Sequence, residues 1–379
     1  MNDINEKVLE AIINQYKYKP PADFKEYLNN MVSSHPVYLY GAGAFGRETL
    51  ALLKANDVNV RGFFDKNAYP GQTMLGLPVY APNPDNISKH NANDLLLIVS
   101  IVLNHEERET LFAALYNMGF TNLIDGQSIR ARQVPFSAGS LEADIDDTTW
   151  QGRMYETLEL FEDTDSREVY IKNLTAHLSR DYSAYAASNN CCQYFPQDVP
   201  LGRGYTNVVD CGAYNGDTLL QLINKAKVCT YVGFEPETSN FQNLVGTASL
   251  ISDENLRVFL YPCAVSNVNR MSFITAKEGS SAVADSGTHA TQLICIDDVL
   301  PHFEPTFVKM DVEGAETDAL IGAKKIICDY RPDLAICVYH YVNDIFEIPL
   351  MLHQWGLGYK FYLRAHSSCT METVLYATV

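Results

Sequence analysis

The chain carries the same three-part pattern twice: a buried strand, a glycine-rich turn that opens a helix, and a second strand that ends in an acid. The first copy runs from Gly41-Ala42-Gly43-Ala44-Phe45-Gly46 to Asp65, and the second from Asp210-Cys211-Gly212-Ala213-Tyr214-Asn215-Gly216 to Glu235. In both copies the acid lies 19 residues after the last glycine (65 − 46 and 235 − 216). Because strands that alternate with helices build parallel sheets, the pattern predicts an α/β chain with two Rossmann-like units.

The second copy has the residues of a pocket for an adenosine-bearing cofactor. Glycines let the backbone pass close to a ligand, and the helix N-terminus after the turn offers unpaired N–H groups. An acid at the position of Glu235 binds ribose hydroxyls. Asp210 before the turn and Asp217 after it would repel a diphosphate but suit a cation. S-adenosyl-L-methionine carries a sulfonium and an ammonium group, so the motif favours a methyl-donor pocket over a dinucleotide pocket.

Acidic residues and a histidine follow two later strands of the same region. Asp311 ends a strand, Glu313 and Glu316 come directly after it, and His340 ends the next strand. Ligands of open α/β sheets bind beyond the carboxyl ends of the strands, so these side chains are expected at one rim with Glu235. His340, Glu313 and Asp311 are the catalytic candidates, since histidine is the usual base near neutral pH. Helix-terminal acids and a structural histidine are the alternatives. A divalent cation held by Asp311, Glu313 and His340 is a further alternative. The spacing does not demand a metal, and none is predicted.

The expected organisation has four segments. Residues 1–35 form helices that are either a cap or an oligomer contact, and residues 36–130 form a Rossmann-like, nucleotide-binding-type domain. Residues 131–200 form a helical connector, and residues 201–379 form the larger α/β domain. The strands expected in this last domain span residues 207–211, 230–235, 257–262, 306–311, 333–338, 358–363 and 372–378.

The first copy of the pattern is a complete G-x-G-x-x-G with a strand before it and a helix after it. Gly41, Gly43, Gly46 and Asp65 are therefore candidates for a second nucleotide site. The unit is short for a dehydrogenase domain, and no Tyr-x-x-x-Lys pair follows the turn. An NAD(P)-linked sugar oxidoreductase or epimerase, a supporting module, and a module that binds a partner or carrier stay open as alternatives.

Charge and cysteine usage narrow the partners and the location. The formal net charge of −18 argues against nucleic acid and against an anionic membrane surface. No stretch reaches the ~20 apolar residues that a membrane span needs, and the N-terminus has no signal-peptide pattern. The nine cysteines form no C-x-x-C pair, so we expect free thiols in a reducing cytoplasm, with Cys191-Cys192 as buried or turn residues.

Residues from about 193 to 366 resemble the FkbM-type S-adenosylmethionine-dependent methyltransferases. The resemblance rests on seven stretches in order: Gln193-Tyr194-Phe195-Pro196, Val209 to Thr218, Phe234-Glu235-Pro236, Ala264-Val265-Ser266, Lys309 to Glu316, Arg331-Pro332 and Val338-Tyr339-His340. It implies a seven-strand methyltransferase fold and O-methylation, commonly of sugars in glycans or of polyketide-type natural products. The acceptor implied here is a saccharide, a nucleotide sugar or another small molecule.

The resemblance also implies roles for single residues. Asp210, Gly212 and Gly216 would line the methionine part of the cofactor, Glu235 the ribose, and Ser281 the adenine edge. Asp311, Glu313 and His340 would face the acceptor. The full expected cofactor set is Tyr194, Asp210, Gly212, Ala213, Tyr214, Gly216, Thr218, Glu235, Pro236 and Ser281.

Overall fold

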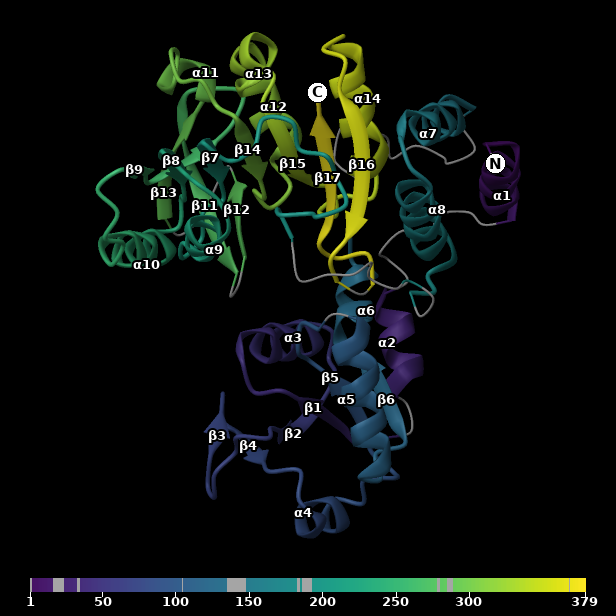
Figure 1. Cartoon of the computed structure of the whole chain (residues 1–379). Helices are drawn as coiled ribbons and strands as arrows, with labels where there is room; N and C mark the ends of the chain where they lie inside the picture. The colour runs from purple at the N-terminus through teal and green to yellow at the C-terminus, as the bar shows by residue number, and fades with distance from the viewer. Residues whose placement is uncertain are drawn as a thin grey trace.

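The computed structural model describes residues 2–15, 24–32, 35–103, 105–134, 148–182, 185, 193–277, 280–284, 289–367 and 369–379. Cys191 and Cys192 lie outside these residues. Figure 1 shows two α/β units, the C-terminal one above and the N-terminal one below, with α6 at their junction. Within the described residues, no helix is both long and apolar enough to cross a membrane.

The C-terminal unit contains a seven-stranded sheet in the order β16-β17-β15-β14-β7-β8-β9. β17 runs antiparallel to the other six strands, which are parallel to one another. All seven strands expected from the sequence are present, and the predicted α/β fold class is confirmed. Their bounds are β7 Asn207–Cys211, β8 Thr230–Phe234, β9 Arg257–Tyr261, β14 Phe307–Met310, β15 Asp333–Cys337, β16 Lys360–Ala365 and β17 Thr373–Thr378.

The strand order of this sheet creates the crevice that positions the site. From β7 the chain adds β8 and β9 on one side and then β14 and β15 on the other, so the order reverses between β7 and β14. The central strands are buried and mostly apolar, as expected for parallel strands covered by helices, but each contains one charged residue. The helices that follow these strands are α9 Asp217–Lys225, α10 Thr238–Ser249, α12 Glu316–Gly322, α13 Lys324–Tyr330 and α14 Asp344–Gln354.

A second, four-stranded sheet was not expected from the sequence. Its order is β10-β13-β11-β12, and α11 (Ile296–Val299) follows it. One side of β11 faces solvent with apolar residues, Met271 and Phe273, so the strand lacks the polar outer face that would mark it. The bounds are β10 Cys263–Val265, β11 Arg270–Lys277, β12 Ser280–Ala284 and β13 His289–Ile294.

The N-terminal unit is a six-stranded sheet in the order β3-β4-β2-β1-β5-β6, parallel except for β3. It repeats the logic of the larger sheet, because β1 lies between β2 and β5. The strands are β1 Val37–Tyr40, β2 Val60–Phe64, β3 Thr73–Met74, β4 Leu77–Tyr80, β5 Leu96–Val99 and β6 Asn122–Asp125. The helices are α3 Ala44–Ala55, α4 Pro84–Lys89, α5 His105–Asn117 and α6 Gly126–Ala131.

The four remaining helices divide between the two units. They are α1 Asn2–Gln15, α2 Phe24–Val32, α7 Thr148–Leu160 and α8 Thr164–Ser179. Helix α1 buries Leu9 and Ile13 in one core with α7 and α8, and α8 packs on the edge strand β16. Helix α2 instead buries Phe24 and Leu28 in the core of the N-terminal sheet. The first predicted segment thus gives one helix to each unit.

The two units meet where the carboxyl edge of the N-terminal sheet reaches the loop between β16 and β17. Gln127 of α6 donates from Nε2 to Ser367 Oγ at 2.6 Å, and its Oε1 accepts from the Leu103 N–H at 3.4 Å. A small apolar cluster seals the same junction, made of Ala131, Ala176, Tyr182 and Cys369.

Candidate active site

A cavity of about 520 Å³ lies at the carboxyl ends of β7, β8 and β14. Glu235 of the β8 end and Asp311 of the β14 end both line it, together with Gly212 of the glycine-rich turn. This is the crevice that the reversal of strand order predicts. The size lies in the range of small-molecule and cofactor pockets.

Glu235 is held by the backbone at the edge of this cavity. Its side chain is 5% exposed, and its two oxygens accept from the N–H groups of Tyr214 and Glu237, each at 2.9 Å. Burial raises the pKa of Glu235, and the two N–H donors oppose that shift. Each carboxylate oxygen has a second lone pair, so the group is fixed in place with acceptor capacity left for a ligand.

The glycine-rich turn requires glycine for steric reasons at two positions. Gly212 has φ +79°, and a Cβ there would lie 1.9 Å from the Asp311 carbonyl oxygen. Gly216 has φ +86° and is the N-cap of α9, which begins at Asp217. The turn therefore lies directly against β14, and α9 points its N-terminus toward the cavity edge where Asp217 and Thr218 line the wall.

Asp210, which the resemblance places at the methionine part of the cofactor, is not among the residues that line the cavity. Its side chain is fully buried, and its Oδ1 lies 3.0 Å from Lys309 Nζ while Oδ2 accepts from Tyr231 Oη at 2.7 Å. Asp210 and Lys309 are direct partners in the parallel pairing of β7 with β14. Burial alone would lower the pKa of Lys309, but the carboxylates of Asp210 and Asp311 raise it. The negative charge expected to attract a cationic cofactor is thus neutralised within the sheet.

Lys309 lines the cavity but was not among the site residues expected from the sequence. It is 3% exposed, donates to the Gly212 carbonyl at 2.6 Å, and lies 5.2 Å from the centre of the Tyr194 ring. The signal was present, because a lysine inside the buried strand Phe307–Met310 needs a charge on a neighbouring strand.

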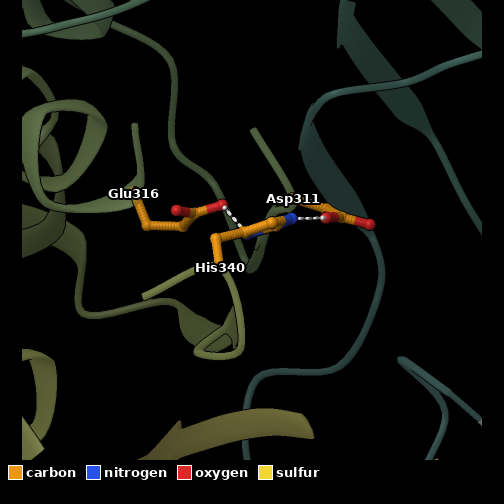
Figure 2. Close-up of side chains that lie close together, drawn as sticks. All are labelled: Asp311, Glu316 and His340. Carbon is orange, nitrogen blue, oxygen red and sulfur yellow. Dashed lines mark ion pairs between the residues drawn. The ribbon is translucent and has the colours of Figure 1, made fainter. Parts of the chain in front are cut away.

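His340 lies between carboxylates on both sides of its ring (Figure 2). Nδ1 is 2.9 Å from Glu316 Oε1, while Nε2 is 3.7 Å from Asp311 Oδ1 and 3.6 Å from Glu313 Oε2. Each of Asp311, Glu316 and His340 offers one side-chain atom that could bind a metal ion, and these three atoms lie within 4.8 Å of one another. Asp311 approaches Nε2 of His340 and Glu316 approaches Nδ1, so the imidazole ring lies between the two carboxylates.

These contacts set the protonation of the cluster. Burial alone would lower the pKa of His340, but Glu316, Glu313 and Asp311 raise it to about 10. Burial raises the pKa of Glu313 to about 7, against the opposing effect of His340. Burial would likewise raise the pKa of Asp311, but Lys309 and His340 hold it below its usual value. At neutral pH the histidine is therefore a cation, and Glu313 is the carboxylate poised to exchange a proton.

The comparisons with known proteins identify this half of the chain. Residues 210–361 match the family model described as the methyltransferase FkbM domain. The chain contains an FkbM-type methyltransferase domain. No curated protein matches the sequence.

A solved structure shares the fold of this chain. The crystal structure of methyltransferase FkbM from Methylobacillus flagellatus KT has a TM-score of 0.66 and 21% identity, over 100% of this chain and 99% of that one. Its likeness therefore includes both α/β units. Aeropyrum pernix fibrillarin, in complex with natively bound S-adenosyl-L-methionine, matches at 11% identity and a TM-score of 0.29, over 47% of this chain and 69% of that one.

The structure brings most of the expected site residues of the methyltransferase domain to one cavity. The lining includes Tyr194, Gly212, Tyr214, Thr218, Glu235, Pro236, Asp311 and Glu313. Asp210, Ala213, Gly216 and His340 are not among the lining residues, and His340 lies behind Asp311 and Glu313. Ser281 belongs to β12, of which only the backbone is described at this position. The lining residues that were not expected from the sequence include Asn240, Cys263, Lys309, Tyr339, Met371 and Glu372.

Four cavity residues have a backbone conformation that non-glycine residues rarely adopt. The φ angles are +66° at Tyr194, +46° at Tyr214, +56° at Glu313 and +54° at Glu372. Such conformations cost free energy and persist only where the surroundings enforce them, so they concentrate at functional sites. Their gathering around one cavity is evidence for function that no sequence pattern showed.

The second expected nucleotide site keeps its glycines but differs in its surroundings. A Cβ at Gly46 would lie 2.1 Å from the Gly41 carbonyl oxygen, so this glycine permits close packing of α3 on β1. Gly43 has open space in front of it. Asp65 accepts from the N–H groups of Ala42 and Asn67, each at 2.8 Å. Occupancy of this turn by a nucleotide stays a prediction.

Proposed function

We propose that this protein is an S-adenosyl-L-methionine-dependent O-methyltransferase whose acceptor is a sugar hydroxyl. The observation that carries the proposal is Glu235, which lies at the end of β8 with both oxygens fixed by backbone N–H groups at the cavity edge. A fixed carboxylate at this strand end suits the two hydroxyls of a ribose.

The cofactor half of the cavity is formed by the glycine-rich turn and by the residues that follow β8. Glu235 would bind the ribose, and Asp217 at the start of α9 is the lining carboxylate for the positively charged end of the cofactor. Lys309 is matched by Asp210, so Asp217 and Glu235 give this half a negative charge. A cationic ligand is favoured there over a diphosphate.

The residues of the acceptor half favour Glu313 as the group that takes the proton. When bound, the cofactor supplies a methyl group on a positively charged sulfur. The task of the chain is to hold the acceptor oxygen in line, which can contribute ~7–11 kcal/mol through positioning. Glu313, with its pKa raised by burial to about 7, takes the hydroxyl proton as the oxygen forms its new bond. His340 is protonated, so it orients Glu313 and Asp311 rather than removing a proton.

A sugar acceptor and a cytoplasmic location complete the proposal. Rossmann-like modules accompany sugar-modifying enzymes, which supports a saccharide by fold-level analogy. The described cysteines are free thiols, in keeping with a reducing compartment.

Calorimetric titration of the purified chain tests the proposal. S-adenosyl-L-methionine should bind at one site per chain, and NAD should not compete with it. Binding of NAD alone would reject the methyltransferase proposal in favour of an oxidoreductase that uses the turn at Gly41.

A further inference from the structure

We infer that the N-terminal Rossmann-like domain forms one wall of the acceptor site, and that its Arg130 determines specificity for an uncharged, hydroxyl-rich acceptor. The inference rests on the proposed function and names the acceptor class of the same site.

The cavity is lined by residues of both domains. Four of its residues come from the N-terminal domain: Val102 and Leu103 follow β5, Glu107 lies in α5 and Arg130 in α6. They follow the carboxyl ends of β5 and β6, so the carboxyl edges of the two sheets face each other across one space. In Figure 1, α6 lies directly below the ends of β16 and β17.

We assign this wall to the acceptor end of the cavity. The charge of Arg130 acts on Glu313, opposing the rise in its pKa that burial causes, and acts in the same way on Glu372. Glu313 is the proposed base, whereas Glu235 marks the cofactor end. Arg130, Glu313 and Glu372 also line the same cavity, so we assign Arg130 to the half in which the hydroxyl must lie.

The loop at the domain junction beside the cavity is strained and is held by hydrogen bonds. The loop between β16 and β17 contains three non-glycine residues at positive φ, with +60° at Cys369, +70° at Thr370 and +54° at Glu372. Ser367 of this loop is fixed by Gln127 of α6, and Glu372 accepts from Gln193 Nε2 at 2.7 Å. Strain of this kind is kept where two surfaces must be held in a set position.

The residues that line the cavity are mainly acidic, and this charge favours one class of acceptor. Six lining residues are acidic: Glu107, Asp217, Glu235, Asp311, Glu313 and Glu372. Of the two basic lining residues, Lys309 is matched by Asp210, and Arg130 has its Nη1 3.6 Å from Glu48 Oε2. The guanidinium of Arg130 carries further N–H groups that can donate to an acceptor. A phosphate or diphosphate would be repelled here. Hydroxyl groups, in contrast, can donate to these carboxylates and accept from the guanidinium of Arg130.

Methyl transfer to two matched sets of sugars tests the inference. The full-length chain is given S-adenosyl-L-methionine with a labelled methyl group and either methyl glycosides of neutral hexoses and deoxyhexoses or the corresponding sugar 1-phosphates. We expect transfer to at least one neutral glycoside. Arg130→Gln should raise the KM for it at least tenfold, with kcat and the Kd of the cofactor changed less than twofold. Arg61→Gln, an exposed arginine of β2 in the same domain, is the control and should change neither value.

The outcomes separate this inference from the proposed function. Failure of the wild type to bind S-adenosyl-L-methionine rejects the proposed function. Normal cofactor binding with transfer only to sugar phosphates, or to no member of either set, overturns the acceptor class. An unchanged KM in Arg130→Gln, or an equal loss of cofactor affinity, overturns the role of the N-terminal wall. Arg130→Lys, which keeps the charge but not the planar donor group, serves if the glutamine variant does not fold.

Discussion

The two Rossmann-like units have the same hydrogen-bonded acid after their second strand, but the residues around this acid differ. In each, the acid after the second strand accepts from an N–H of the glycine-rich turn and from the N–H two residues further on. Around Glu235 there is a large cavity, several strained residues and a buried ion pair in the neighbouring strands. Around Asp65 the corresponding strands β1 and β5 pair through uncharged residues only. The hydrogen bonds of the acid therefore define the turn, and the charges around it define the site.

The largest expected difference between the units is in the free energy of unfolding, and it comes from the buried ion pair of Asp210 and Lys309. Lys309→Met leaves Asp210 as an unpaired charge in the sheet and should lower the free energy of unfolding by about 3–5 kcal/mol in urea denaturation. Lys66→Met, at an exposed lysine after β2, should stay within about 0.5 kcal/mol. The double variant Asp210→Asn with Lys309→Met should recover most of the loss. A loss below about 1 kcal/mol in the single variant would contradict the assigned pair.

The next difference is in cofactor binding. Glu235→Ala should weaken binding of S-adenosyl-L-methionine by about 1–3 kcal/mol, because ribose hydroxyls lose their acceptor. Asp65→Ala removes the equivalent carboxylate from the N-terminal turn and should leave that affinity unchanged. Calorimetry measures both, with thermal melting to confirm folding. Equal losses in the two variants would mean that the acids act on stability alone and that the cofactor assignment is wrong.

A smaller difference between the two units is expected in how their stability depends on pH. The folded state raises the pKa of His340 to about 10 from 6.5, so it holds a proton that the unfolded chain loses between those values. The stability from His340 is complete below about pH 6.5 and is lost as the pH rises through 10. We expect a decline of about 1 kcal/mol per pH unit between pH 7 and 9, measured by urea denaturation.

Two variants test the source of this slope. His340→Gln should flatten it, although it also destabilises the chain at every pH because Glu316 loses its partner. His90 is the matched control in the N-terminal unit, where burial lowers its pKa below 6.5. Its own titration therefore lies below pH 6.5, and His90→Gln should leave the slope above pH 7 unchanged. An unaltered slope in His340→Gln would show that His340 is not the cation of the cluster.

The comparison also explains what the sequence could and could not predict. The seven-stranded sheet and the strands β1, β2 and β5 of the N-terminal sheet follow from apolar runs and glycine turns, because a buried parallel strand and its turn are encoded locally. The strands β3, β4 and β6 were not expected from the sequence. Glu235, Asp311 and Glu313 followed from the same logic, since each lies at a strand end. The pairing of Asp210 with Lys309 depends on the register of two strands that are far apart in the sequence. Arg130 depends on how two domains meet, which no local pattern contains.

The smallest expected effect concerns the N-terminal turn and decides whether the resemblance between the units extends to ligands. Gly43 has φ −93°, and a Cβ there would meet no atom within 4 Å. Gly43→Ala should therefore fold normally, with a change of less than about 1 kcal/mol in unfolding free energy. If this turn serves only the fold, the variant will also keep the S-adenosyl-L-methionine affinity and the acceptor KM of the wild type.

A nucleotide bound at this turn would give a different result, because its phosphates would need the space that the new methyl group fills. Titration of the wild type and Gly43→Ala with NAD measures this directly. Heat released by the wild type and lost in the variant would show that the N-terminal unit binds a nucleotide as well. Asp65 and Glu235 would then both bind a ligand, and the two units would differ in the identity of that ligand.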